Sequence, residues 1–365
     1  MNILHATNQT TWDTFLSTQQ FRPFLQSWTM GEVYRDCGEE PIRMEIRDGN
    51  TLVGICQAIV VNARRGKHLA IPYGPITNHQ SPITNHLIPA LKEEARRQQC
   101  SFIRMSPFWT AGHDPISGSK PSPLHLLAEH IWYLPLKEND PWKNQGSELT
   151  NERMNELTIL AGMRSNTRNL IRRAEKEGVT IEASRDPFAD LPAFIALHDE
   201  TRKRHGFTPY SNDFFRAQVK HFSARKECTL YKALYNGEVI SASIHMHAFG
   251  ETSYHHGAST HAFSKIPSSY LLQWTAIKDA LQRGDHVYNF WGIAPLQKNE
   301  SKNESPTRQA QGKPITNHPF AGVTTFKTGF GGTLLELTHC MDVPVDARYV
   351  LTRAFETYRK WRRGF

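Results

Sequence analysis

The most specific chemical signal in the sequence is a lysine that precedes a glycine-rich turn. The segment from Phe320 to Gly332 reads FAGVTTFKTGFGG and follows the run YNFWGI. We expect a strand that ends at Phe326 and Lys327 and enters a turn whose glycines let the backbone approach a ligand, because glycine lacks a Cβ and tolerates positive φ. Lys327 is then a point charge at the mouth of a cleft. An ordinary strand-end lysine above a glycine turn is the alternative.

A second signal is a basic stripe between Met163 and Gly178. Basic side chains occupy every fourth position there, while apolar residues take a different set of positions; the basic residues are Arg164, Arg168, Arg172 and Lys176. On a helix, residues with this spacing share one side. The stripe fits the phosphates of RNA or of a nucleotide, and it also fits the solvated face of an amphipathic helix.

Histidines gather in the second half without the spacing of a metal site. They are His245 and His247, two apart in an expected strand, followed by His255, His256 and His261. No matching Cys, Asp or Glu spacing accompanies them, so we expect half-buried histidines and no metal ion. The nucleophile elbow of hydrolases, the Walker A loop and the dinucleotide fingerprint are absent from the sequence as well.

Charge and cysteine usage indicate the class of partner and the cellular compartment. The chain has 43 Lys and Arg against 35 Asp and Glu, a net charge of +8, which favours an anionic partner. Residues 348–365 carry six basic side chains and one Glu, interleaved with aromatic residues; this pattern predicts a docked helix with a basic exterior, which could also touch tRNA or an anionic bilayer. Five scattered cysteines and the lack of an apolar leader or membrane span predict a cytoplasmic protein, with peripheral contact at the inner membrane surface as an option.

The order of expected elements is repeated in the two halves. Helices flank a hairpin at Asp48-Gly49 in the first half and one at Asn236-Gly237 in the second, with further strands and a helix after each hairpin. The pattern predicts an α/β (α+β) fold of mixed sheets flanked by helices. We place the first domain at residues 1–155, the second at 156–347, and a basic C-terminal helix at 348–365 that packs back on the first domain. The tandem KNESKNES, 298–305, predicts a loop.

Several segments together resemble the Fem family of peptidoglycan-bridge aminoacyltransferases, FemABX. In chain order they are FLQSW from Phe24, YGP from Tyr73, MRSNTR from Met163, YHHGAS from Tyr254, YLLQW from Tyr270, YNFWG from Tyr288 and FKTGFGG from Phe326. They run over nearly the whole chain. The resemblance implies two tandem acetyltransferase-like (GNAT-like) domains with a cleft between them. It also implies transfer of an amino acid from aminoacyl-tRNA to the stem-peptide amine of a peptidoglycan precursor, either lipid II or UDP-MurNAc-pentapeptide.

The same resemblance implies roles for individual residues. Phe326 and Lys327 stand at the reacting centre, and Tyr254 contacts the precursor. Arg204 and Arg35 are looser matches that anchor the phosphates or sugar of the precursor. The stripe of Arg164, Arg168 and Arg172 is our candidate tRNA contact. Ser106 stands where the family often has an acidic residue, and the coiled-coil arm of some members is absent.

Aminolysis of an aminoacyl ester needs a neutral amine, an attack geometry and stabilisation of the oxyanion that forms at the carbonyl. Lys327 can supply positive charge to that oxyanion, and the attacking amine can hand its proton to the leaving ribose oxygen. We therefore expect no cofactor besides aminoacyl-tRNA as the co-substrate. Two alternatives stay open. One is an acyl-coenzyme A dependent N-acyltransferase, whose signature Gln/Arg-x-x-Gly-x-Gly/Ala is not found, and the other is a non-catalytic protein that binds RNA or the precursor.

Overall fold

The computed structural model describes residues 1–64, 66–77, 83–112, 116–143, 152–205, 210–297, 313–314 and 318–363. The loop predicted at 298–305 lies outside these residues. The chain forms two compact units: the first unit contains Met1–Glu129 and Glu336–Phe365, and the second unit contains His130–Leu335.

These units differ from the domain boundaries expected at residues 155 and 347. The strand His130–Pro135 follows the first unit in the sequence but pairs with Val287–Gly292 of the second sheet. The strand Met341–Pro344 pairs with Phe102–Ser106 of the first sheet. The chain therefore crosses between the units twice, because backbone pairing between distant segments sets the units.

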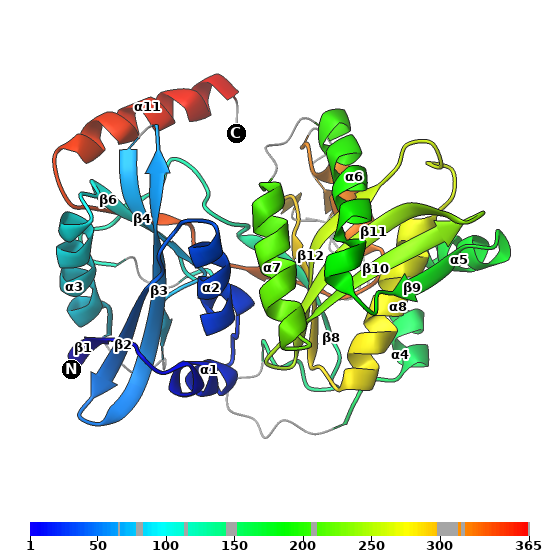
Figure 1. The fold of residues 1–365 in the computed structure, drawn as a ribbon, viewed down its shortest axis with the longest axis horizontal. Helices are drawn as coiled ribbons and strands as arrows, with labels where there is room; N and C mark the ends of the chain where they lie inside the picture. The colour runs from blue at the N-terminus through cyan, green and yellow to red at the C-terminus, as the bar shows by residue number, and fades with distance from the viewer. Residues whose placement is uncertain are drawn as a thin grey trace. The chain divides into compact units, whose positions relative to one another are not determined.

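The first unit is a mixed sheet with helices on both faces. Its elements are β1 (Asn2–His5), α1 (Gln9–Ser17), the short helix η1 (Phe24–Gln26), α2 (Trp28–Asp36), β2 (Ile42–Asp48), β3 (Thr51–Ala63), β4 (Gly66–Pro72), β5 (Ile76–Thr77), α3 (Ile83–Arg97), β6 (Phe102–Ser106), β7 (Lys120–Pro121), β17 (Met341–Pro344) and α11 (Arg348–Arg363). The strand order is β1-β2-β3-β4-β6-β17-β7, with β5 beside β3. Figure 1 shows α3 on one face of this sheet and α1 and α2 on the other.

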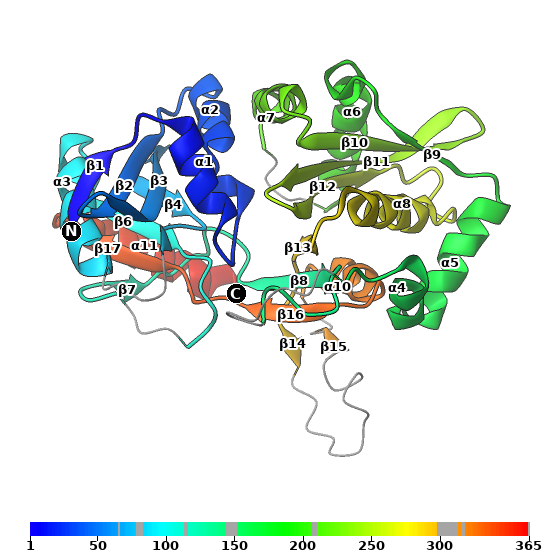
Figure 2. The ribbon, with the colours of Figure 1, turned by 90° about the horizontal axis from the view of Figure 1, so that it is seen from below.

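The second unit is also a mixed sheet between helices. Its elements are β8 (His130–Pro135), α4 (Glu156–Gly162), α5 (Ser165–Lys176), β9 (Thr180–Ala183), α6 (Pro187–His205), α7 (Asn212–Ala224), β10 (Cys228–Tyr235), β11 (Glu238–Ala248), β12 (Glu251–Ser259), α8 (Ser268–Arg283), β13 (Val287–Gly292), β14 (Leu296–Gln297), β15 (Lys313–Pro314), α10 (Ala321–Thr328) and β16 (Thr333–Glu336). The strand order is β16-β8-β13-β12-β11-β10-β9. Figure 2 shows α6 and α7 on one face of the sheet and α8 on the other.

Local sequence explains the elements that were expected. Asn236 and Gly237 have φ of 51° and 82°, the left-handed conformation that a tight two-residue hairpin needs between β10 and β11. α8 ends at Gly284, which adopts φ of 85° and so provides a left-handed helix end. α7 was not predicted, although its buried residues Phe214, Phe215, Val219 and Phe222 follow a helical spacing. Within the described residues, no helix combines the length and apolar character needed to span a bilayer.

A buried ionic group connects β6, β17 and α11 in the first unit. The Arg104 guanidinium donates to the Asp342 carboxylate at 2.8 and 2.9 Å and to the Glu356 carboxylate at 2.6 and 3.3 Å. Each of the three side chains is at most 6% exposed. The two carboxylates share one cation away from water. The stability of the folded first unit therefore depends on Arg104, which compensates their buried negative charge.

Replacing Arg104 with Met should therefore leave two buried carboxylates without their cation. We expect the free energy of unfolding of the first unit to fall by about 3–5 kcal/mol. Denaturant titration with a probe in the first unit measures this change. The matched control is Arg216→Met, which removes an arginine from the exposed pair with Asp213 and should change stability little. Equal stability of the Arg104 and Arg216 variants would contradict this account of the ionic group.

Candidate active site

Lys327 lies on a helix rather than at the end of a strand, so the expected strand is wrong. Side-chain hydrogen bonds explain how the β-branched residues of α10 fit a helix. The hydroxyls of Thr324, Thr325 and Thr328 each donate to the carbonyl oxygen four residues earlier, at 2.8 to 3.0 Å. Threonine makes this bond readily in helices, so the β-branched residues of this segment are compatible with a helix.

The Lys327 ammonium is buried at the end of β13. Its side chain is 7% exposed, and Nζ donates to the carbonyl oxygen of Gly292 at 2.7 Å. None of the described carboxylates forms an ion pair with it, and burial lowers the pKa of Lys327 to about 7. Near neutral pH the amine therefore exists in both its charged and its neutral form.

Tyr254 of β12 is the aromatic neighbour of this amine. Lys327 Nζ lies 5.7 Å from the centre of the Tyr254 ring, within range of a cation–π interaction. The ring stacks on His245 with centroids 5.3 Å apart. A Cβ at Gly257 would collide with the Tyr254 hydroxyl, so glycine three residues after the tyrosine leaves room for the phenol. Part of the YHHGAS segment is thus explained by the position of Tyr254.

The buried histidines of the second sheet form hydrogen bonds with neighbouring side chains. Tyr288 donates its hydroxyl to Gln273 at 2.6 Å and lies 2.8 Å from His245 Nε2, so this nitrogen carries the proton of the bond to Tyr288. His255 and His256 both contact Gln218. Burial lowers the pKa of His255 to about 3 and that of His256 well below its usual value, so both are neutral.

The glycines after α10 approach the protein's own backbone, which corrects the expectation that they make room for a ligand. Gly331 and Gly332 have φ of 82° and 96°. A Cβ at Gly332 would collide with the carbonyl oxygen of Tyr133 in β8, and one at Gly331 would lie 2.9 Å from the carbonyl oxygen of Gly162. The Trp132 indole N–H also donates to Gly331 O at 2.7 Å. The turn therefore fixes α10, and with it Lys327, against β8 and α4.

Phe326 and Arg204 line one pocket of about 280 Å³ in the second unit. Tyr270, at the start of α8, lines the same pocket and meets Phe326 edge to face, with centroids 4.9 Å apart. The structure thus places Arg204 and Phe326 at the same pocket. Tyr254 lies beside Lys327, which is the residue after Phe326 in α10. These four predicted residues belong to one region.

The loop before α8 uses its hydrogen-bond donors internally. The Glu200 carboxylate accepts from the His261 amide at 2.6 Å and from the Thr260 hydroxyl at 3.1 Å. The Ser268 amide, at the first residue of α8, donates to Ile266 O at 2.9 Å. A phosphate bound at a helix start needs such amides to be available.

Sequence reasoning missed Glu200 and the Gly292 carbonyl. The strand β13 was expected, but nothing in its sequence indicates which of its carbonyl oxygens accepts the hydrogen bond from the lysine.

The basic stripe lies on a helix, α5, but its arginines differ in environment. Arg164 precedes the helix, is partly buried, and burial lowers the pKa of its guanidinium. Arg168 donates to the carbonyl oxygens of Leu160 and Met163, so it holds the end of α4. Arg172 is exposed. Of the three candidate tRNA contacts, Arg172 is the exposed one, so its binding to a phosphate would leave the packing of α5 unchanged.

Arg35 lies in the first unit, apart from the residues above. It lines a pocket of about 630 Å³ together with Trp28, Arg43 and Lys67. Its guanidinium pairs with Glu32 and, at 2.8 Å, with Glu40. A ligand phosphate would have to compete with both carboxylates for this arginine.

The buried amine gives a prediction about stability and pH. A folded-state pKa near 7 lies below the ordinary lysine value of 10.5, so the unfolded chain binds more protons between these values and stability rises with pH across that range. Replacing Lys327 with Met should raise the free energy of unfolding at pH 7 by about 1–3 kcal/mol and flatten this dependence. Thermal denaturation between pH 6 and pH 10 measures both effects. A less stable variant with an unchanged pH dependence would contradict the lowered pKa.

Two protein-family models match the chain, one in each unit. The FemAB family model matches residues 7–123, and the acetyltransferase (GNAT) domain model matches residues 161–298. No curated protein matches the sequence. The crystal structure of FemX is similar, with a TM-score of 0.74 and 17% identity over 98% of this chain and 100% of that chain.

Two further solved structures share the fold at lower similarity. One is a conserved protein of unknown function from Bacteroides thetaiotaomicron, with a TM-score of 0.57 and 10% identity over 93% of this chain and 99% of that one. The other is the C-terminal domain of a protein assigned as a lysylphosphatidylglycerol synthetase from Agrobacterium fabrum, with a TM-score of 0.53 and 15% identity over 89% and 90% of the two chains. The FemAB model in the first unit, the acetyltransferase model in the second and the fold shared with FemX support a FemABX-family protein, an acyl- or aminoacyltransferase built from acetyltransferase-like domains.

Proposed function

We propose that the protein transfers the aminoacyl group of an aminoacyl-tRNA to the stem-peptide amine of a peptidoglycan precursor. The observation that carries the proposal is the Lys327 amine, buried beside Tyr254 and held by the Gly292 carbonyl. Burying an unpaired ammonium lowers stability, and such a group persists where it serves chemistry.

The reaction forms one bond and breaks another at the ester carbonyl. The acceptor amine attacks the carbonyl carbon, the carbon–nitrogen bond forms, and negative charge develops on the carbonyl oxygen. The charged form of Lys327 stabilises this oxygen. The bond to the ribose oxygen then breaks, and the proton lost by the amine passes to that oxygen. A pKa near 7 lets Lys327 serve also as a proton relay in this step.

The other predicted residues have roles that follow from their surroundings. Tyr254 and Phe326 form aromatic walls beside the lysine, and Arg204 provides positive charge at the mouth of the adjoining pocket. Arg172 contacts phosphates of the tRNA, whereas Arg164 and Arg168 mainly position α5. Arg35 binds the precursor through the pocket of the first unit.

The acyl-coenzyme A alternative is less well supported. The signature Gln/Arg-x-x-Gly-x-Gly/Ala is not found in the sequence, and the amide of Ser268, the first residue of α8, already donates to Ile266 O. The third alternative, a protein that only binds RNA or precursor, does not explain the buried lysine.

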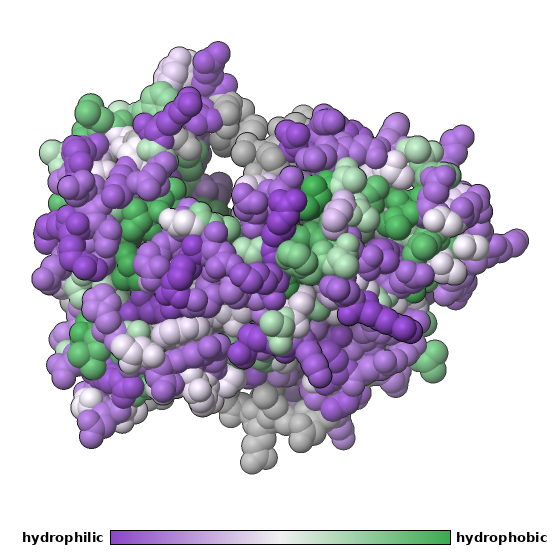
Figure 3. All heavy atoms as spheres, viewed as in Figure 1, coloured by the Kyte–Doolittle hydropathy of each residue, from purple (hydrophilic) through white to green (hydrophobic). Residues whose placement is uncertain are grey.

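The acceptor in this proposal is lipid-linked, and α11 carries the argument. Apolar side chains stand out from the first unit along this helix, at 49 to 78% exposure: Val350, Leu351, Phe355, Tyr358 and Trp361. Basic side chains flank them, and the one acid of the helix, Glu356, is buried against Arg104. The molecular face drawn in Figure 3 is mostly polar, and apolar patches lie between the polar areas. An exposed face that is apolar and basic matches the surface of an anionic bilayer. The name of the Agrobacterium relative, a lysylphosphatidylglycerol synthetase, refers to a lipid and is consistent with a lipid-linked acceptor in this proposal.

Transfer itself tests the role of Lys327. With charged tRNA and a precursor, Lys327→Met should reduce the rate of transfer about 100-fold, because a positive group near the oxyanion is lost. The advantage of the wild type should shrink as pH rises above about 7, where Lys327 loses its proton. Lys203→Met, which removes an exposed lysine from α6, is the control. Transfer by the Lys327 variant at the wild-type rate would remove this residue from the mechanism, and transfer from acetyl-coenzyme A instead of charged tRNA would overturn the proposed donor.

Vesicle binding tests the role of α11. The full chain should bind vesicles that contain phosphatidylglycerol and bind pure phosphatidylcholine vesicles weakly, with a loss of affinity as salt rises. Replacing Leu351, Phe355 and Trp361 with Ser should lower the affinity for anionic vesicles at least tenfold. Leu157→Ser changes an equally exposed leucine on α4 and should have no effect. Co-sedimentation measures the bound fraction, and unchanged binding by the triple variant would contradict a membrane role.

A further inference from the structure

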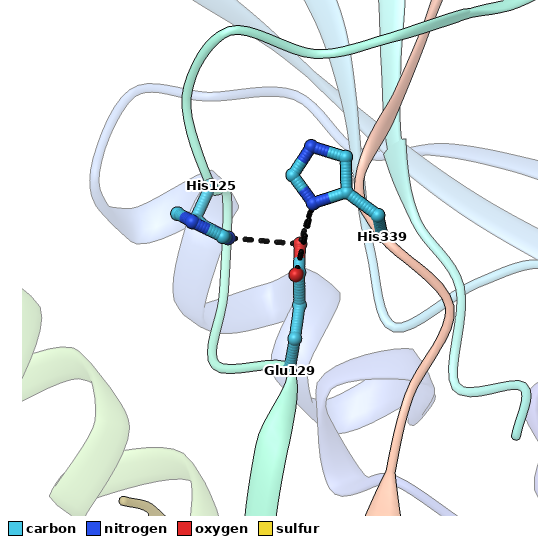
Figure 4. Close-up of side chains that lie close together, drawn as sticks. All are labelled: His125, Glu129 and His339. Atoms are coloured by element: carbon cyan, nitrogen blue, oxygen red, sulfur yellow. Dashed lines mark hydrogen bonds and ion pairs between the residues drawn. The ribbon is translucent and has the colours of Figure 1, made fainter. Parts of the chain in front are cut away.

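Two histidines and one glutamate converge in the first unit, outside the proposed active site. Figure 4 shows that His125 and Glu129 come from the segment leading into β8, while His339 comes from the segment between β16 and β17. Their potential ligand atoms all lie within 4.8 Å of one another, and across the described ranges no other set of His, Cys, Asp or Glu meets this criterion. Sequence patterns do not predict this cluster, because Glu129 and His339 are 210 positions apart.

The hydrogen bonds of His339 require a cation between its ring and Glu129. His339 Nδ1 lies 2.9 Å from each Glu129 oxygen, and Nε2 lies 3.0 Å from the carbonyl oxygen of Ser122. Carboxylate and carbonyl oxygens only accept hydrogen bonds, whereas a neutral imidazole has one N–H. When Nε2 donates to Ser122, the lone pair of Nδ1 points at a carboxylate. A second proton or a metal ion must therefore occupy this position.

His125 adds a second nitrogen at the same carboxylate. Its Nδ1 lies 2.9 Å from Glu129 Oε1, so two imidazole nitrogens face one oxygen from different chain segments. The Ser122 carbonyl holds the His339 ring in the tautomer whose Nδ1 can bind a metal, which is the usual arrangement around metal-ligating histidines. Glu129 is itself positioned by the Cys340 amide, which donates to Oε1 at 2.9 Å.

We propose that His125, Glu129 and His339 bind a divalent transition metal ion, and that the ion is zinc. Two imidazoles and one carboxylate form a common zinc ligand set, and the fourth position is open to water. In a tetrahedral site with bonds of about 2.1 Å, ligand atoms stand roughly 3.4 Å apart, so the present 2.9 Å contacts open by about 0.5 Å on binding. Glu129 is 9% exposed, whereas His125 and His339 are 60% and 38% exposed and leave a path for the ion.

The place of the cluster indicates a structural role. Glu129 is the last residue before the chain enters the second unit, and His339 follows shortly after its return at Glu336. The Leu337 amide donates to Glu129 O at 2.8 Å, so the outgoing and returning segments already lie side by side. A bound zinc ion cross-links these two segments within the first unit and restricts their separation.

Metal titration of the full chain tests the proposal. After treatment with a chelator, the protein should bind one Zn²⁺ per chain in isothermal titration calorimetry, and Co²⁺ should give the intense visible absorption of a four-coordinate site. His339→Ala and Glu129→Gln should each weaken Zn²⁺ affinity at least tenfold, because each removes one of three ligands. Glu129→Gln keeps an acceptor for the Cys340 amide, so its folding is preserved. His86→Ala, an exposed histidine of α3, is the control and should bind as the wild type does.

Zinc should also raise the thermal midpoint of the wild type and not that of Glu129→Gln. Binding at one equivalent with equal affinity in the wild type and in both ligand variants would place the ion elsewhere and overturn the proposal. Absence of saturable binding would overturn it as well, and would leave the second proton on His339 as the cation that the hydrogen bonds require.

Discussion

The second unit is organised around one costly group, the Lys327 ammonium. Water is removed from it, and no described carboxylate compensates the charge, so its interaction with the Gly292 carbonyl and the Tyr254 ring must hold it in place. Each contact comes from a different element: α10 supplies the lysine, β13 the carbonyl and β12 the ring. The two glycines after α10 allow the backbone to pack against β8 closely enough to keep that helix in position. A closely packed glycine turn thus supports one amine whose pKa is lowered by burial.

In the first unit, the charge of a buried cation is compensated by carboxylates. Arg104 is buried too, but two carboxylates surround it, and the group ties the returning strand β17 and the helix α11 to the sheet. This paired arrangement serves structure, whereas the unpaired lysine of the second unit is expensive and suited to chemistry. This contrast is the reason that our proposal places the reacting centre in the second unit.

Sequence patterns predicted the elements whose shape is decided locally. The Asn-Gly hairpin needs two residues with positive φ, and Gly284 ends α8 in the left-handed conformation, so both are visible in the chain itself. The segment around Lys327 was mistaken for a strand because threonines favour strands unless their hydroxyls bond back to the helix. The compact units differ from the expected domain boundaries because β8 and β17 pair with strands far away in sequence, which no local pattern records. In the same way, the sequence marked Arg168 as a phosphate ligand, but only the fold reveals that it binds the end of α4.

The protonation of Lys327 is the most direct test of this account. The wild-type chain can be labelled with ¹⁵N at lysine side chains, Lys327 assigned by comparison with Lys327→Met, and its Nζ resonance followed from pH 5 to pH 11. The account predicts a midpoint of about 7, well below that of exposed lysines such as Lys203 in the same spectrum. A midpoint near 10.5, equal to theirs, would show that the amine is solvated and would contradict the central claim.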